Sequence, residues 1–216
     1  MKKNDLSIAL TIVLVMLAFN AFPAVGSAYH YLNNTYGMWM SFLKFAVLAT
    51  FGESLALRLR TGRYNQKGFG LIPRAIVWGL LGLTIKMAFI IFASGTPIFL
   101  QYMGFTEATT VMQQAFSPLK LLVAFAISST MNLIYAPVMM TLHRITDTHI
   151  VANGGTIRGL FRPVLFRKIF NELDWDSMWN FVFKKTIPFF WIPAHTITFL
   201  GYVLIITAFS LNNQNN

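Results

Sequence analysis

The stretch "AIVWGLLGLTIKMAFIIFASG", residues Ala75 to Gly95, decides the fold class. Its only charged residue is Lys86, and most of the other positions are Leu, Ile, Phe, Ala or Gly. A helix of about 20 residues rises about 30 Å, which matches the hydrocarbon core of a bilayer. Because the apolar run is continuous rather than alternating, it is typical of a transmembrane helix and not of a strand in a transmembrane barrel.

Four further apolar runs of comparable length flank this stretch. The chain is 56% apolar and 11% charged, so we expect an all-α fold, a multispan helical membrane bundle that forms one integral membrane domain over residues 1–216. The five predicted spans cover residues 6–25, 39–57, 75–95, 116–140 and 183–211. The first run also fits a secretory signal, because "MKKND" precedes it and the small residues of "AVGSA" follow.

The chain carries 17 Lys and Arg against 7 Asp and Glu. In a membrane protein the placement of this charge matters more than its total, so we do not expect nucleic acid as a partner. Basic residues gather before the first span, between spans two and three and between spans four and five, whereas "GSAYHYLNNTYGM" and "TPIFLQYMGFTEATTVMQQ" contain none. The positive-inside rule predicts a cytoplasmic N-terminus, a C-terminus outside, and a cytoplasmic face that attracts anionic lipid.

Three lysines lie inside the predicted spans, all in the half nearer the outside: Lys44, Lys86 and Lys120. Ionisable side chains in a span usually face the bundle interior or water, so together they predict an electropositive cavity. Alternatively, Lys44 and Lys120 extend to the outer headgroups. Lys86 would then form a structural ion pair with Glu53, the only acidic residue inside a span.

The last predicted span contains "IPFFWIPAHTITFL", residues 187–200, with Pro188, Pro193 and His195. Each proline lacks an amide donor, so we expect this helix to be broken between them, near the bilayer midplane. Discontinuous helices at that depth often form substrate sites, with His195 at the opening. The alternative is a packing kink with His195 hydrogen-bonded to a neighbouring helix. Asn132 in "ISSTMN" either bonds a neighbouring helix or lines a polar path.

Other segments favour structural roles. Basic and aromatic residues alternate over residues 161–180, which predicts an interfacial amphipathic helix, and Asp174 and Asp176 could instead cap the approach to the last span. Gly79 and Gly82 are expected to let a neighbouring helix approach closely. The sequence contains no cysteine and no recognised catalytic or nucleotide-binding motif, and the spacing in "HRITDTH" fits no metal site. We expect neither enzyme activity nor a cofactor.

From the second span onward the chain resembles the Mpv-seventeen and peroxisomal membrane protein twenty-two family. The residues that carry the resemblance are Gly52-Glu53, Pro73 with Trp78, Gln113 with Pro118, and Phe189 with Pro193. The sequence departs from the family pattern at Glu53, where an Asp is usual, and at Gly79, Met112 and Ile197. The resemblance implies a small multispan protein that acts as a pore for small molecules. Since "MKKND" does not look like a transit peptide, we expect a bacterial relative in the plasma (inner) membrane.

Two function classes follow from these observations. The first is a small-solute channel or transporter with a basic, anion-favouring interior built from Lys44, Lys86, Lys120 and His195. The second is a non-transporting membrane scaffold whose basic cytoplasmic loops bind anionic lipid or a protein partner. The sequence does not name the solute, and it leaves open whether the chain forms a homo-oligomer.

Overall fold

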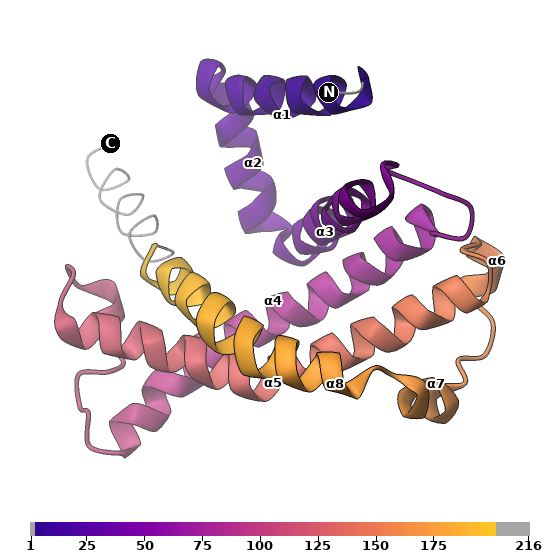
Figure 1. Ribbon diagram of the computed structural model, residues 1–216. Coiled ribbons are helices and arrows are strands. Elements are labelled where there is room, and N and C mark those ends of the chain that lie inside the picture. Colours follow the sequence, from indigo (N-terminus) through magenta and orange to yellow (C-terminus); the bar gives the residue numbers. More distant parts are fainter. Residues whose placement is uncertain (1–2, 202–216) are drawn as a thin grey trace.

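The computed structural model describes residues 3–201, and all regular structure within them is helical (Figure 1). Helix α3 packs along α4, and α4 crosses α5. The elements in chain order are α1 (Lys3–Ala21), α2 (Pro23–Thr35), α3 (Gly37–Thr61), α4 (Leu71–Tyr102), η1 (Val111–Gln113), α5 (Pro118–Ala152), α6 (Ile157–Leu160), α7 (Phe166–Glu172), α8 (Trp175–Ser177) and η2 (Met178–Trp191).

Among the described residues, three helices are long and apolar enough to cross a membrane, namely α3, α4 and α5. They contain the predicted spans 39–57 and 75–95 and nearly all of 116–140. Helices α4 and α5, with 32 and 35 residues, are about 50 Å long and so exceed the hydrocarbon thickness. This composition indicates an integral membrane protein whose long helices project beyond the apolar layer.

The predicted first span, residues 6–25, is not one straight helix. The chain bends by 94° between α1 and α2, so the pair counts at most as one broken span. Pro23 begins α2, and Phe22 before it has an extended backbone, as expected for a residue that precedes proline. Most of "GSAYHYLNNTYGM", predicted as a connection, is therefore helical. The described part contains three helices that could cross a membrane, or four if the bent pair is one span, so the predicted count of five is not confirmed.

The predicted break at Pro188 and Pro193 is wrong. Residues 178–191 form a π-helix that contains Pro188, and an α-helix continues without interruption from residue 192 to 201. Pro193 lies in the first turn of this α-helical segment, which follows the π-helix directly, so the helix continues there with one amide donor fewer. The carbonyl of Ile192 accepts hydrogen bonds from the hydroxyls of Ser128 and Thr196, both at 2.7 Å. Residues 202–211 of the predicted fifth span lie outside the described residues.

Residues 161–180 do not form one interfacial helix. They contain α7, α8 and the start of η2, because the chain turns after residue 160 and again between α7 and α8. Ile169 and Leu173 pack against Ile145, so this segment is attached to α5. The Asp174 carboxylate accepts the Ser177 N–H at 3.0 Å and caps α8, as the sequence suggested.

Helices α3 and α4 approach closely at two glycines, as predicted. A Cβ on Gly79 would lie 2.5 Å from the ring of Phe42, and a Cβ on Gly82 would lie 2.7 Å from the Cβ of Phe45. The hydroxyl of Ser41 donates to the Gly82 carbonyl at 2.9 Å. Only glycine leaves enough room at these positions, so the α3–α4 contact depends on them.

The start of α1 is bonded to the end of α3. Arg58 donates two hydrogen bonds to the Asp5 carboxylate, at 2.8 and 2.7 Å, and the Tyr64 hydroxyl donates a third at 3.0 Å. Burial and the nearby Asp5 raise the pKa of Tyr64. The beginning of the described chain therefore lies at the same end of the bundle as the α3–α4 connection.

Candidate functional site

A cavity of about 520 Å³ lies between α3, α4 and the helical segment 192–201. Lys44 of α3 and Lys86 of α4 both line it, and none of its described lining residues is acidic. The remaining lining residues are mostly apolar, with three hydroxyls, those of Ser41, Ser94 and Thr198. We call this the lysine cavity. Two of the three predicted lysines therefore come together.

The two lysines have few polar contacts. Lys44 Nζ donates to Asn33 Oδ1 at 2.8 Å and lies 5.7 Å from the centroid of the Tyr29 ring. The side chain of Lys86 reaches the start of α3, where its Cε is 3.9 Å from the position of a Cβ on Gly37. Both are half-buried in largely apolar surroundings. The described lining therefore carries two lysine side chains and no acidic one.

Lys120 does not belong to this cavity. It is 2% exposed, and its Nζ donates to the Gln114 carbonyl at 2.6 Å. Its own amide donates to the Ser117 hydroxyl, which caps α5. Lys120 thus connects the first turn of α5 to the preceding loop, and the predicted cluster of three lysines is reduced to two.

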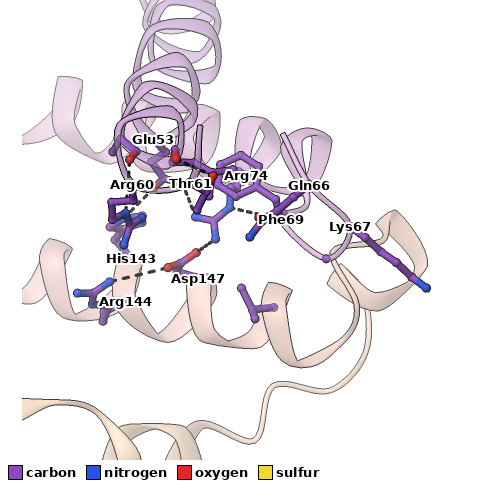
Figure 2. A pocket seen from close by; sticks show the side chains of 14 residues that line it. Glu53, Arg60, Thr61, Gln66, Lys67, Phe69, Arg74, His143, Arg144 and Asp147 are labelled. Carbon is purple, nitrogen blue, oxygen red and sulfur yellow. Dashed lines mark hydrogen bonds and ion pairs between the residues drawn. The ribbon is translucent and has the colours of Figure 1, made fainter. Parts of the chain in front are cut away.

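The predicted ion pair between Lys86 and Glu53 is wrong. Lys86 lies beside Gly37, and Glu53 is about 24 Å further along α3. Glu53 belongs instead to a charged network at the opposite end of the α3–α4 contact (Figure 2).

Arg74 is the centre of this network. Its guanidinium forms ion pairs with Glu53 of α3 and Asp147 of α5, and its Nε donates to the Phe69 carbonyl at 2.7 Å. Glu53 also accepts the Trp78 indole N–H at 2.9 Å, and His143 Nε2 lies 3.1 Å from the same oxygen. Arg74 is only 7% exposed, so its charge is neutralised by neighbours rather than by water.

The network connects three helices through side chains alone. Glu53 is on α3, Arg74 and Trp78 are on α4, and His143 and Asp147 are on α5. The rings of Trp78 and His143 also pack together, with centroids 4.3 Å apart. We call these five residues the Arg74 network. Because Arg74 pairs with carboxylates on two other helices, the network acts as a structural clamp between α3, α4 and α5.

Asn132 and His195 form a polar pair between α5 and the last helix. The Asn132 amide lies 3.0 Å from His195 Nδ1 and also donates to the Ser128 carbonyl at 2.8 Å. The His195 ring contacts Phe89, with centroids 5.2 Å apart, and Phe89 lines the lysine cavity. His195 is therefore separated from the lysine cavity by one aromatic ring. Neither Pro188 nor Pro193 lines that cavity.

Sequence reasoning missed most of the Arg74 network. Arg74 was assigned to a charged loop, whereas it is the fourth residue of α4 and buried. The segment "HRITDTH" was tested only as a metal motif, although its spacing of four places His143 and Asp147 on one face of a helix. That spacing, together with the excess of basic residues nearby, is the sequence signal that indicates an ion-pair network at this place.

No protein-family model, no curated protein and no solved structure matches the chain. The resemblance therefore depends on its short motifs, and two of them meet in space. Glu53 of Gly52-Glu53 accepts the hydrogen bond from Trp78, which follows Pro73 by five residues.

Proposed function

We propose that this protein is a channel or transporter for small anionic solutes and that the lysine cavity is its solute-binding site. The observation that supports this function is the meeting of Lys44 and Lys86 in one cavity without a carboxylate. A lysine at the centre of a membrane-spanning helix is unfavourable by about 2.5–3.5 kcal/mol on insertion scales. An anion between two such lysines offsets the free-energy cost of their desolvation and reduces their mutual repulsion.

The size and lining of the cavity suit a small solute. A volume of about 520 Å³ falls within the usual range for small-molecule sites. The hydroxyls of Ser94 and Thr198 line the same cavity as the two lysines, each donating to a carbonyl of its own helix, and aromatic rings such as Phe89 supply an apolar wall. This combination favours a small carboxylate or a comparable monovalent or divalent anion.

The packing of α3 on α4 supports a gated path rather than an open one. Gly82 and Gly79 bring the helices into contact beside the lysine cavity, and the Arg74 network fastens their other ends. A solute that crosses the bundle then requires α3 to move relative to α4. The resemblance to the Mpv-seventeen family agrees with this function, and we propose a plasma-membrane location with a cytoplasmic N-terminus.

Flux into liposomes tests the proposal. We expect purified, reconstituted protein to conduct small anions such as chloride or acetate faster than protein-free liposomes, with little uptake of a neutral sugar of similar size. The double variant Lys44→Met with Lys86→Met removes both charges but keeps the side-chain length. Its anion flux should fall by about tenfold or more, which corresponds to the loss of roughly 1.4 kcal/mol of interaction.

Lys185→Met is the matched control, because Lys185 is exposed and does not line the lysine cavity. Its flux should equal that of the wild type. Liposomes that stay tight with the wild-type protein would reject the channel and transporter function and favour the scaffold. Equal losses in the control and the double variant would reject the lysine cavity as the solute site.

A further inference from the structure

A second cavity, of about 530 Å³, lies beside the Arg74 network (Figure 2). It is formed where α3 ends, α4 begins and the C-terminal half of α5 passes, and the loop of residues 62–70 borders it. The side chains that matter most for its chemistry are Arg60, Thr61, Gln66, Lys67, His143 and Arg144. We call it the arginine cavity.

The arginine cavity carries an excess of positive charge. Four basic residues line it, Arg60, Lys67, Arg74 and Arg144, against two acidic ones, Glu53 and Asp147. Both acids form ion pairs with the buried guanidinium of Arg74. The four basic and two acidic residues leave the described lining with an excess of two positive charges.

Two guanidinium groups are available to a ligand. Within the described part of the chain, Arg60 Nε makes one long contact of 3.4 Å, to the Ala56 carbonyl, and a backbone carbonyl carries no net charge. Arg144 Nη1 is 3.9 Å from Asp147 Oδ2, at the limit of an ion pair, and its side chain is 50% exposed. Neither arginine is held as firmly as Arg74, so both can turn toward an anion.

Figure 2 shows Arg60 and Arg144 on the same side of the network, with His143 between them, while Lys67 points away. Arg60 comes from α3 and Arg144 from α5, so an anion between them would bridge two helices. His143 Nδ1 is buried and has no hydrogen-bond partner within residues 3–201, although His143 lines the same cavity. Because this atom is fully buried, Arg60 and Arg144 rather than His143 would contact an anion in the cavity.

We propose that the arginine cavity binds a phosphate group between Arg60 and Arg144. The planar fork of a guanidinium matches the spacing of two phosphate oxygens, and two arginines on different helices can each bind a pair. A phosphate monoester or inorganic phosphate carries more charge than a carboxylate, which suits the excess of two positive charges. The cavity lies at the ends of membrane-spanning helices, so the phosphate group comes either from a lipid headgroup or from free solute.

Binding to the full-length protein in detergent tests this site. Inorganic phosphate is titrated into the protein by calorimetry at constant ionic strength, and dihexanoyl phosphatidic acid is titrated in a parallel arm. Saturable binding of inorganic phosphate identifies a free-phosphate site, and binding of the short-chain lipid alone identifies a headgroup site. Absence of binding in both arms overturns the proposal.

The double variant Arg60→Gln with Arg144→Gln keeps hydrogen-bonding ability and removes the charge. We expect its affinity for whichever ligand binds to fall by about tenfold or more. Arg63→Gln with Arg158→Gln is the matched control, because both residues are exposed and neither lines the arginine cavity. Equal affinity in the two double variants overturns the proposal. Since Arg60 and Arg144 are also exposed, an unchanged unfolding midpoint should accompany the loss of binding.

The same titration on Lys44→Met with Lys86→Met separates this inference from the proposed function. Phosphate binding should be unchanged in that variant, because the lysine cavity lies at the other end of the α3–α4 contact. A loss of binding there, with normal binding in Arg60→Gln with Arg144→Gln, would assign the phosphate to the lysine cavity and reject the arginine cavity.

Discussion

The two ends of the α3–α4 pair contain charge in opposite arrangements. At one end Arg74 is buried and forms ion pairs with carboxylates on two other helices. At the other end Lys44 and Lys86 line a cavity whose described lining contains no acid. The same two helices supply both ends, and the difference lies in whether the cations have carboxylate partners.

This difference separates structural charge from ligand-binding charge. A buried cation that already has its counterions gains little from a further anion, and its removal leaves those counterions uncompensated. A cation without a counterion gains from any anion that enters, and its removal leaves nothing unpaired. The comparison therefore predicts that charge removal has opposite effects on stability at the two ends.

Arg74→Met should show the largest effect. The change leaves Glu53 and Asp147 partly buried without their shared cation, and breaking a buried pair typically lowers the free energy of unfolding by about 3–5 kcal/mol. Unfolding of the purified protein in mixed detergent micelles by titration with dodecyl sulfate measures this loss.

Lys86→Met, on the same helix, is the control for Arg74→Met. Because no carboxylate shares its cavity, its stability should equal or exceed that of the wild type. Equal destabilisation by the two substitutions would contradict the distinction between paired and unpaired charge.

The contact that separates the two ends provides the second prediction. Gly82→Ala places a Cβ 2.7 Å from the Cβ of Phe45, and neither atom can move without its helix. We expect a loss of about 1–3 kcal/mol, typical of overpacking. Gly95→Ala in the same helix meets nothing within 4 Å and should be neutral or stabilising, because alanine favours helix over glycine. Equal effects of the two changes in the same unfolding titration would show that α3 and α4 are not in close contact.

The sequence predicted the helical class and the middle spans because their apolar runs are long and continuous. It did not predict the helix geometry at the two terminal runs, because hydropathy does not show whether a proline bends a helix or is accommodated in it. Pro23 produces a sharp bend between α1 and α2, whereas Pro188 and Pro193 are accommodated in a continuous helix. The outcome depends on neighbours such as Ser128, whose hydroxyl bonds the Ile192 carbonyl, and a single sequence does not identify those neighbours.

The candidate site was predicted in part for a similar reason. Depth along each span was enough to place Lys44 and Lys86 in the same half of the bundle, since both depths follow from helical rise. The partner of Glu53 depends on which end of α4 lies beside it, and Arg74 precedes the apolar run 75–95 that predicts this span. The depth of a residue along one helix follows from its position in the sequence. Which residues pair between two helices depends also on how the helices are aligned along their axes.

The smallest expected effect concerns the neutral pair of Asn132 and His195, which lies one aromatic ring from the lysine cavity. Hydrogen bonds between membrane helices contribute about 0.6 kcal/mol on average, because the unfolded state in the membrane also finds partners. A double-mutant cycle of Asn132→Leu and His195→Leu in the dodecyl sulfate titration should therefore give a coupling free energy near that value. Ser129→Ala on the same helix is a matched control, because its hydroxyl has no hydrogen-bond partner within residues 3–201 and its loss should not destabilise the protein. A coupling of zero would show that the pair does not form. A coupling well above 1.7 kcal/mol would exceed the range known for neutral pairs in membranes and would place Asn132 and His195 with the Arg74 network, as part of the structural clamp.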